Sequence, residues 1–451
     1  GGGLWNGSGT MTLAGVTIDG NNASGAAADN GGGGVFNSGG VVNIQSGTTM
    51  GGNLADGTAG SGGGIFNDAG GTLTISDSTI TGNSANRAGG GIEDNSGAGL
   101  GVVLNSVALQ SNAALSNPGS GGGLHVTGAG DVLISASTIS TNNAAASGGG
   151  LWNGSGTMTV VDTNVTDNVA AGPAATDGGG AIFNNGGTLL LSGTTFIGSN
   201  NANGAAANGG GAFVNGGSLQ ANGIAISNNT SQGVYAAAGA VVSLTNVGSS
   251  NIGQGLETDG AASVYLNAGL YSGILIRSTG SMITDGDVNA TSPIDVETTG
   301  SIDVQTGGWF GPTNVILAPG TTATFAAGTS SGYVGTTLLS SGTTIIDGTL
   351  DSSGGTVTVG SGAVLGGSGF INRAVDVDGV IDPGPIGVSP ADTGLLQVES
   401  VAFGDGSQLR VQLNSTVPVT GYDQLRVVNG SVSIDAGSML TGGATTTFAD
   451  G

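Results

Sequence analysis

Hydrophobic and polar residues alternate in short runs along the first half of the chain. In residues 72–76, Leu73 and Ile75 share one face of an extended strand and the threonines take the other. A second short run, residues 78–81, follows at once and ends at Gly82-Asn83. The same pattern places further apolar residues on one face, at Met11, Leu13 and Ile18, at Val102, Leu104 and Leu109, and at Leu189, Leu191 and Phe196. These runs predict short β-strands that each have one buried face.

A glycine-rich motif, Gly-Gly-Gly-apolar-aromatic-Asn, precedes each pair of runs. Copies or variants of it begin at Gly1, Gly32, Gly62, Gly89, Gly121, Gly148, Gly179 and Gly210, with GGGLHV from Gly121, GGAIFN from Gly179 and GGAFVN from Gly210. The spacings are 31, 30, 27, 32, 27, 31 and 31 residues. Three short strands in each unit cannot form a core alone, but successive coils can cover one another. The sequence therefore predicts an all-β right-handed single-stranded parallel β-helix, an elongated solenoid.

An asparagine closes the third strand of each repeat, at Asn21, Asn53, Asn83, Asn112, Asn142, Asn168, Asn200 and Asn229. We expect stacked coils to align these side chains into a ladder of amides. The alternative is that asparagine is present because it tolerates a left-handed turn. The glycine triplets are expected to supply positive φ and close approach between coils. Eight copies without a lysine argue against a phosphate-binding loop.

Changes in the repeat pattern along the chain predict three parts. These are a glycine-rich β-helix of eight coils in residues 1–238, an irregular continuation in 239–335, and a further set of β-solenoid repeats in 336–451. Strands are expected in the second part at residues 241–245, 262–267, 273–277, 294–297 and 301–305. Loop length varies between each asparagine and the next glycine triplet. This predicts a low rim of small residues and not a deep cleft.

Charge and composition narrow the class of protein. The chain has 29 acidic residues, five arginines, no lysine and a formal net charge of -24, so nucleic acid and anionic membrane surfaces are poor partners. Cysteine is absent, and no apolar run approaches the ~18 residues of a membrane helix. The chain opens without methionine on a full repeat and has no basic and apolar leader. We therefore expect a processed form or a segment of a longer protein.

Two resemblances point to bacterial surface proteins. The GGGIFN and TLTISDSTITGN units resemble the Gly-Gly-x-Ile repeats of polymorphic outer-membrane proteins, over about residues 1–238. The run GTVTVGSGAVLGGSGF, with the segments VDVDGVIDPGPIG and GSQLRVQL, resembles the autotransporter-associated β-strand repeat over about residues 336–430. These resemblances imply secretion, display on a bacterial cell surface, and frequently adhesion.

Enzymatic chemistry is not expected from this sequence. Glycoside hydrolases need two nearby carboxylates, and the candidate pairs are Glu93/Asp94, Asp285/Asp287, Asp295/Glu297 and Asp376/Asp378. We interpret them as solvated pairs on an acidic surface. A lyase base is hard to place, because no arginine is expected on one face with an acidic cluster, and Arg373 falls on the face opposite Asp376 and Asp378. No catalytic, cofactor-binding or metal-binding residue is therefore assigned.

Three weaker signals have competing interpretations. The single histidine, His125, takes the place of Trp5, Phe36 and Trp152 in other repeats, and is interpreted as a substituted strand residue. The recurrent aromatics Trp5, Phe36, Phe66, Trp152 and Phe183 could stack on sugars, but packing against an adjacent corner or in the core is favoured. Calcium is the one ion considered, through Asp285/Asp287 or Asp376/Asp378/Asp382. Arrays of threonine for ice or mineral binding are too scattered to be favoured.

The function predicted from these features is that of an extracellular, cell-surface structural or adhesive protein. End-to-end association with like chains, to form a fibre, or contact with other surface proteins is expected, and glycans are possible partners. The alternative is a protein that binds or degrades polysaccharides.

Overall fold

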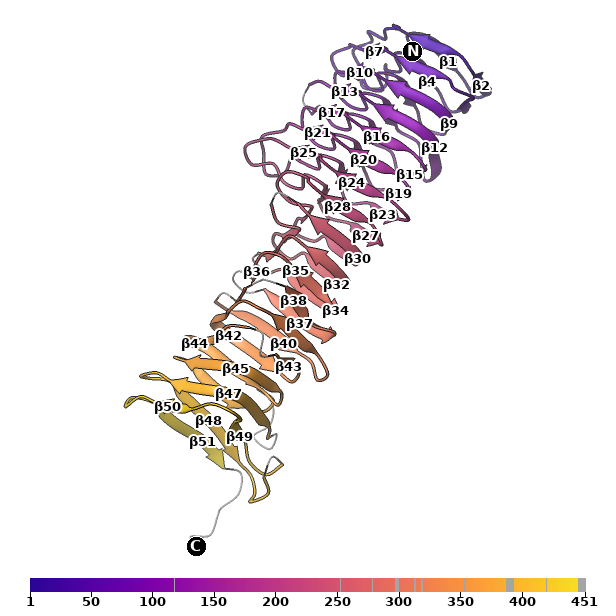
Figure 1. Cartoon of the computed structure of the whole chain (residues 1–451). Helices are drawn as coiled ribbons and strands as arrows, with labels where there is room; N and C mark the ends of the chain where they lie inside the picture. The colour runs from indigo at the N-terminus through magenta and orange to yellow at the C-terminus, as the bar shows by residue number, and fades with distance from the viewer. Residues whose placement is uncertain are drawn as a thin grey trace. The chain divides into compact units, whose positions relative to one another are not determined.

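The computed structural model describes residues 1–451 except 117, 252, 278, 297–299, 312–313, 318, 352–353, 387–392, 419 and 445–451. The described residues form 51 β-strands and no helix, so none of them lies in a helix that could cross a membrane. The chain divides into two compact units, Gly1–Glu257 and Thr258–Gly451. Within each unit parallel strands pair coil upon coil, which confirms the predicted all-β parallel β-solenoid (Figure 1).

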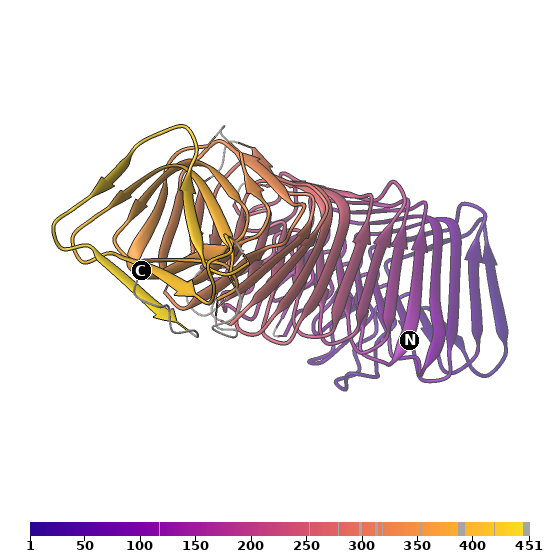
Figure 2. The same cartoon turned by 90° about the horizontal axis from the view of Figure 1, so that it is seen from below.

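Each coil of the first unit begins with a strand of three residues, which in the first eight coils lies at the glycine-rich motif. These first strands are β1 (Leu4–Asn6), β4 (Val35–Asn37), β8 (Ile65–Asn67), β11 (Ile92–Asp94), β14 (Leu124–Val126), β18 (Leu151–Asn153), β22 (Ile182–Asn184), β26 (Ala212–Val214) and β29 (Val234–Ala236). Each pairs in parallel with the first strand of the next coil, and in Figure 2 the strands of this unit lie side by side.

The second and third strands supply most of the core. The second strands are β2 (Thr10–Ala14), β5 (Val41–Gln45), β15 (Gly130–Ser135), β19 (Thr157–Val161), β23 (Thr188–Ser192) and β27 (Ser218–Asn222). The third strands are β3 (Thr17–Asp19), β6 (Thr49–Gly51), β16 (Thr138–Ser140), β20 (Asn164–Thr166), β24 (Phe196–Gly198) and β28 (Ala225–Ser227). In three coils one longer strand spans both positions: β9 (Thr72–Thr81), β12 (Gly99–Gln110) and β30 (Val241–Ser250).

A fourth strand, not expected from the sequence, follows the corner asparagine in six coils. These strands have two residues each and form a separate parallel sheet: β7 (Leu54–Ala55), β10 (Ser84–Ala85), β13 (Ala113–Ala114), β17 (Asn143–Ala144), β21 (Val169–Ala170) and β25 (Asn201–Ala202). The variable loops therefore leave the coil from a paired strand.

Apolar side chains of successive coils line up in the predicted columns. Leu73 pairs in register with Val102, and Val102 with Val132, and all three are at most 1% exposed. One prediction was wrong: Phe196 is partly exposed, whereas the next residue, Ile197, is fully buried and pairs with Val165. The ladder asparagine marks this register, since the inward residue lies three positions before it in each of the eight coils from Asn21 to Asn229.

The predicted asparagine ladder is confirmed. Each Nδ2 donates to Oδ1 of the asparagine in the next coil at 2.9–3.0 Å, along Asn21, Asn53, Asn83, Asn112, Asn142, Asn168, Asn200, Asn229 and a ninth member, Asn251. The asparagine itself does not take the left-handed conformation. That conformation belongs to the residue before it, as at Gly82 (φ 65), Ser111 (φ 55) and Thr141 (φ 53). The ladder interpretation is therefore correct, and the turn interpretation is wrong.

The glycine triplet acts as expected at the entrance to the first strand. Gly32 has φ 71, and a Cβ on Gly33 would lie 2.4 Å from the carbonyl oxygen of Gly63 in the next coil. The eighth repeat is offset by one residue from the sequence alignment, because Phe213 pairs with Phe183 and Val214 with Asn184. Its motif is thus Gly-Gly-Gly-Ala-Phe-Val from Gly209.

The second unit has shorter coils. Val264, Met282, Ile302 and Ala323 pair successively, at separations of 18, 20 and 21 residues. After β31 (Leu256–Thr258), at the boundary of the units, its strands are β32 (Ser263–Tyr271), β33 (Ile274–Ile276), β34 (Ser281–Asp285), β35 (Val288–Ala290), β36 (Ile294–Val296), β37 (Ser301–Thr306), β38 (Trp309–Gly311), β39 (Val315–Leu317), β40 (Thr321–Phe325), β41 (Ser330–Tyr333), β42 (Thr337–Ile346), β43 (Thr349–Leu350), β44 (Val357–Gly367), β45 (Phe370–Val377), β46 (Val380–Pro383), β47 (Leu395–Phe403), β48 (Gln408–Leu413), β49 (Gln424–Val427), β50 (Val432–Ile434) and β51 (Met439–Ala444).

Candidate functional site

The Glu93/Asp94 pair was expected to be solvated, and this is wrong, because both residues are 0% exposed. Strand alternation sends the two side chains to opposite faces of β11. Glu93 pairs in register with Phe66 and His125, so it occupies the aromatic position of its coil. Asp94 occupies the position of Asn67. The two carboxylates therefore do not face a common substrate position, as a hydrolase pair must.

Glu93 is the centre of a buried polar cluster. Arg87 Nη2 lies 3.1 Å from Glu93 Oε1, and His125 Nδ1 lies 3.1 Å from Oε2. The hydroxyl of Thr127 donates to Oε1 at 2.5 Å, and its oxygen is 3.1 Å from His125 Nδ1. The imidazole of His125 in turn stacks on Trp152, with ring centroids 4.2 Å apart. This cluster was not expected, since no arginine was expected on one face with an acidic cluster.

The cluster contains the residue types of a catalytic triad but not its geometry. In a triad, one imidazole nitrogen meets the nucleophilic hydroxyl and the other meets the carboxylate. Here Thr127 and Glu93 both contact the same nitrogen, Nδ1 of His125. The arrangement favours an internal polar cluster, in which Glu93 and His125 fill two aromatic positions of the column and Arg87 pairs with Glu93.

Asp94 belongs to a second side-chain ladder that the sequence analysis missed. Asn6 donates to Asn37, Asn37 to Asn67, and Asn67 to Asp94, at 2.7–2.8 Å, and Ser96 also donates to Asp94 at 2.8 Å. Burial raises the pKa of Asp94, and the hydrogen bonds from Asn67 and Ser96 oppose this.

Val126 interrupts this second ladder after Asp94. The ladder resumes in the next coil, where Asn153 donates to Asn184 at 2.7 Å. Asn153 Oδ1 is buried and accepts no hydrogen bond from any described residue. A valine one coil earlier explains this, because valine has no amide to donate. The signal for the second ladder was present in the sequence, as the asparagine that ends each GGGxxN motif.

A second acidic cluster lies in the second unit. Arg410 Nη1 is 3.1 Å from Asp382 Oδ2, although no arginine was expected on one face with an acidic cluster. Asp423 accepts hydrogen bonds from the backbone N–H groups of Gly394 (2.8 Å) and Gln412 (2.7 Å). Burial raises the pKa of Asp382, against the effect of Arg410, and burial also raises the pKa of Asp423, to which the charge of Asp382 adds. Asp382, one of the carboxylates considered for calcium, is therefore paired with Arg410.

The remaining predicted carboxylates do not gather. Asp285, Asp287, Asp376 and Asp378 are exposed, and Asp295 is half-buried. Glu297 lies outside the described residues. Among the residues that the structure describes, no group of three His, Asp or Glu side chains could hold a metal ion. Calcium binding stays a prediction without a site.

Arg373 was correctly placed on the face opposite Asp376 and Asp378, but that face is the core. It is 1% exposed and donates to the carbonyl oxygens of Asp351 and Tyr333 at 2.8 Å each. Its guanidinium lies 4.2 Å from the centroid of the Tyr333 ring. The residue ties together corners of preceding coils, which is a structural role.

The recurrent aromatics form a stacked column on the outer side of the first strands. Trp5 and Phe36 stack with centroids 4.7 Å apart, and Phe36 and Phe66 at 5.2 Å. The column resumes from His125 through Trp152 to Phe183. Phe36, Phe66 and Phe183 are at most 5% exposed, whereas Trp5 is 63% exposed. Packing, the favoured interpretation, is therefore confirmed for the buried members, and only Trp5 offers a large open ring.

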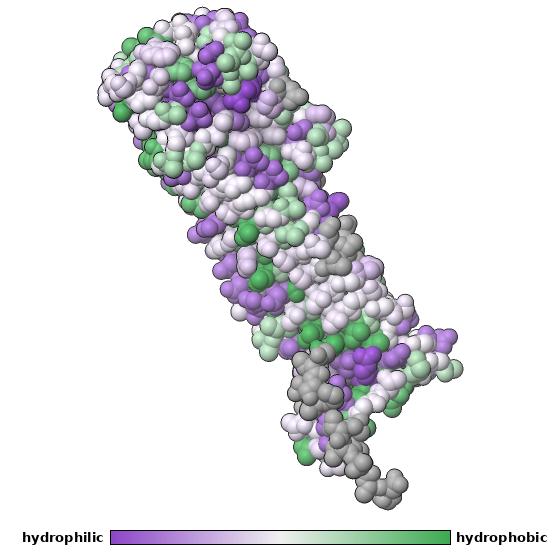
Figure 3. Space-filling view, turned by 180° about the vertical axis from the view of Figure 1, so that it is seen from behind, coloured by the Kyte–Doolittle hydropathy of each residue, from purple (hydrophilic) through white to green (hydrophobic). Residues whose placement is uncertain are grey.

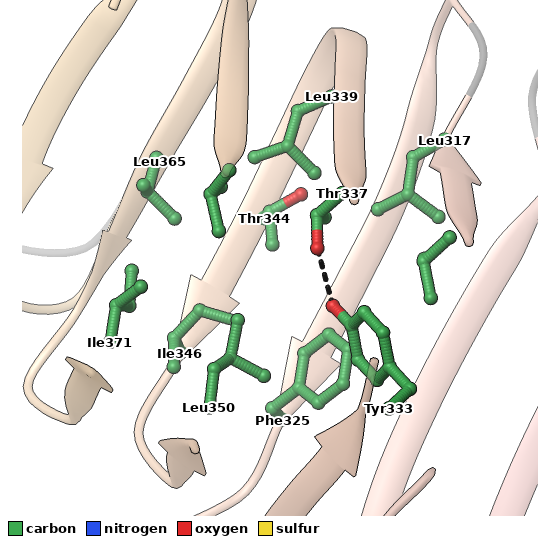
Figure 4. Close-up of a pocket in the computed structure, with 12 residues that line it drawn as sticks. Leu317, Phe325, Tyr333, Thr337, Leu339, Thr344, Ile346, Leu350, Leu365 and Ile371 are labelled. Atoms are coloured by element: carbon green, nitrogen blue, oxygen red, sulfur yellow. Dashed lines mark hydrogen bonds between the residues drawn. The ribbon is translucent and has the colours of Figure 1, made fainter. Parts of the chain in front are cut away.

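Two of the hollows in the structure differ greatly in size. One, of about 480 Å³, lies beside Trp5 in the first unit, between the aromatic column and the loop of residues 22–30. The other lies inside the second unit, lined mainly by apolar side chains, with the Tyr333 hydroxyl bonded to Thr337 (Figure 4). The inner hollow has room for about one water, about 10 Å³, so it is a packing gap and not a ligand pocket.

The surface itself has no broad apolar band on the face seen in Figure 3, where hydrophobic residues lie in small scattered groups. Threonines form only short aligned rows: Thr17, Thr49 and Thr79 pair in register, but Ala108 follows. This supports the low rank given to ice or mineral binding.

In comparisons with known proteins, no protein-family model matches the chain, and no curated protein matches it.

Proposed function

We propose that this chain is an architectural protein of a bacterial cell surface, a scaffold or adhesive passenger and not an enzyme. The observation that carries the proposal is the asparagine ladder from Asn21 to Asn251. Each member from Asn21 to Asn229 is held by the next asparagine through both its backbone N–H and its side chain, as at Asn112, which donates both to Asn142 Oδ1 at 3.0 Å. A stack tied in this way resists local opening, which suits a protein whose use is a durable surface.

Three further features support the surface role. The resemblances to polymorphic outer-membrane proteins and to autotransporter passengers imply secretion and display. The net charge of -24 favours solubility outside the cell. The absence of cysteine also means that this chain depends on burial and hydrogen bonds for its stability and not on disulfides.

Immunoelectron microscopy of the native cells tests the proposal. We expect the label on the cell surface, and we expect a strain without the protein to adhere less to its substratum. Label confined to the cell interior would refute the proposal. Light scattering tests the association of like chains separately, since a monodisperse monomer with native termini would exclude end-to-end fibres.

The competing function is polysaccharide cleavage. A panel of glycans, assayed with Asp285→Asn and Asp376→Asn controls, separates the two functions. Cleavage that either substitution abolishes would replace the architectural role with an enzymatic one. We expect no cleavage, because these carboxylates and their neighbours Asp287 and Asp378 are all exposed on the surface.

A further inference from the structure

A shallow groove of about 280 Å³ lies on the outer face of three successive strands, β23, β27 and β30, which follow one another in Figure 1. Strand β23 pairs with β19 and β27, and β27 pairs with β23 and β30, so the groove lies over a continuous part of the sheet. Pockets that bind small ligands commonly measure about 300–1,000 Å³. The groove is therefore close in size to the smallest of these pockets.

Strand alternation and register place two rows of side chains in the groove. Leu191, Ala221 and Leu244 pair in register and are at most 3% exposed, so the residues before and after each of them point outward. The row before them consists of Leu190, Gln220 and Ser243, and the row after them of Ser192, Asn222 and Thr245. The two amide side chains are exposed and the other four side chains are half-buried. Five of the six outward side chains are thus polar.

The five polar side chains keep their hydrogen-bonding capacity for a ligand. None of them bonds to another side chain or to the backbone within the part of the chain that the structure describes. By contrast, two residues earlier on the same strands, the hydroxyl of Ser218 donates to Thr188 Oγ1 at 3.3 Å. Amides and hydroxyls both donate and accept hydrogen bonds. The groove therefore offers donors and acceptors side by side, with Leu190 as its one apolar side chain.

Charge excludes an ionic ligand. No charged side chain among the described residues lines the groove, and the whole chain has a net charge of -24 and no lysine. An anionic sugar or a phosphate would be repelled without meeting a compensating cation, and a cation would find no carboxylate in the groove. The ligand that fits is therefore uncharged.

A peptide strand is not favoured either. The backbone N–H and C=O groups of β23 and β27 are engaged by strands on both sides, so neither strand offers an edge at which a peptide could extend the sheet. Recognition in the groove must use side chains alone.

An uncharged saccharide matches these features. Its hydroxyls donate and accept hydrogen bonds, as the five polar side chains do, and its C–H face can pack on Leu190. We propose that the groove over β23, β27 and β30 binds an uncharged oligosaccharide, with its hydroxyls bonded to Gln220, Asn222 and the neighbouring serines and threonine. This site goes beyond the architectural role and does not depend on it.

Saturation-transfer NMR of the whole chain, titrated with uncharged hexasaccharides of glucose, xylose and N-acetylglucosamine, tests the proposal, with oligogalacturonate as the anionic probe. We expect at least one uncharged hexasaccharide to bind with a dissociation constant in the millimolar range, since a shallow groove buries little of its ligand. The double variant Gln220→Ala/Asn222→Ala should weaken this binding at least tenfold. The matched control is Gln45→Ala, at an exposed glutamine on the outer face of β5, which should leave binding unchanged.

Four results would overturn the site: no binding of any uncharged hexasaccharide at millimolar concentration, undiminished binding in the double variant, an equal loss in Gln45→Ala, or tighter binding of oligogalacturonate. Gln220 and Asn222 are exposed, so the double variant should keep its thermal unfolding midpoint. If the midpoint falls, the single variants Gln220→Ala and Asn222→Ala provide the same comparison. The surface role is judged by microscopy, so the two proposals fail separately.

Discussion

Replacing one member of the asparagine ladder should loosen the first unit, and Asn142→Leu is the sharpest case. Leucine has nearly the shape of asparagine, so the substitution removes polar atoms without opening a large cavity. The side chain of Asn142 makes four bonds to other residues: Oδ1 accepts from Asn112 N and Nδ2, and Nδ2 donates to Leu109 O and Asn168 Oδ1.

The expected cost follows from the groups left without partners. In Asn142→Leu, two hydrogens of the buried Asn112 lose their acceptor. Asn168 Oδ1 still accepts from the backbone N–H of residue 142. Each buried donor without a partner costs about 1–3 kcal/mol, so the substitution should cost about 2–6 kcal/mol. Because about 1.4 kcal/mol changes an equilibrium constant tenfold, the population of locally open states should rise roughly thirtyfold or more.

Hydrogen exchange followed by mass spectrometry measures this locally, which matters because long repeat arrays need not unfold in one step. Peptides that cover Asn112 should exchange at least about thirtyfold faster in Asn142→Leu. The matched control is Asn143→Leu, whose side chain is exposed and which should change stability by less than about 0.5 kcal/mol. Equal exchange in the two variants would refute the ladder as a source of stability.

Three further predictions concern other parts of the first unit. Ala136 is exposed and has φ 48, so Ala136→Gly should relieve about 0.5–1 kcal/mol of backbone strain and raise the urea midpoint of unfolding. The control, Ala108→Gly in strand β12, should lower that midpoint. A lower midpoint in both variants would contradict the strain assigned to Ala136. Arg87→Met leaves Glu93 buried without its cation and should lower the free energy of unfolding, measured by chemical denaturation, by about 3 kcal/mol. Adding Glu93→Gln should recover part of this loss. A double variant that is less stable than Arg87→Met alone would argue against the Arg87–Glu93 ion pair. The raised pKa of Asp94 means that the folded state binds its proton more tightly than the unfolded chain, so this contribution to stability is full below the unfolded pKa and is lost as pH rises through the folded one. Asp94→Asn should therefore flatten the decline of thermal stability with rising pH above about pH 4, and an unchanged pH profile would exclude Asp94 as the cause.

The fold was predictable because its determinants repeat at a fixed offset. The ladder asparagines recur at the same place in each unit, and stacking converts a recurrent side chain into a continuous interaction. Phe196 shows the limit of this reasoning. Alternation counted from the second strand selected Phe196, whereas counting back three residues from Asn200 selects Ile197, the residue that is buried.

The polar cluster could not be read from the sequence in the same way. Glu93 and His125 lie where most coils have an aromatic residue. Two polar residues at this position in adjacent coils were the only sign of the cluster in the sequence. Their partner Arg87 comes from the variable loop, whose path no periodicity fixes. Arg373 is similar, since its acceptors belong to Asp351 and Tyr333, 22 and 40 residues earlier in the chain.

The central claim, that successive coils pair in a fixed parallel register, is tested most directly by engineered disulfides in this cysteine-free chain. Ala108 and Thr138 are paired, so a cysteine at each should oxidise readily to a disulfide. Ser140 pairs with Gln110 and lies two residues further along the strand, about 8 Å from residue 108, beyond disulfide reach. We expect the 108/138 pair to cross-link and the 108/140 pair to stay reduced. Equal cross-linking of both pairs, or preference for 108/140, would contradict the stacked register on which the rest depends.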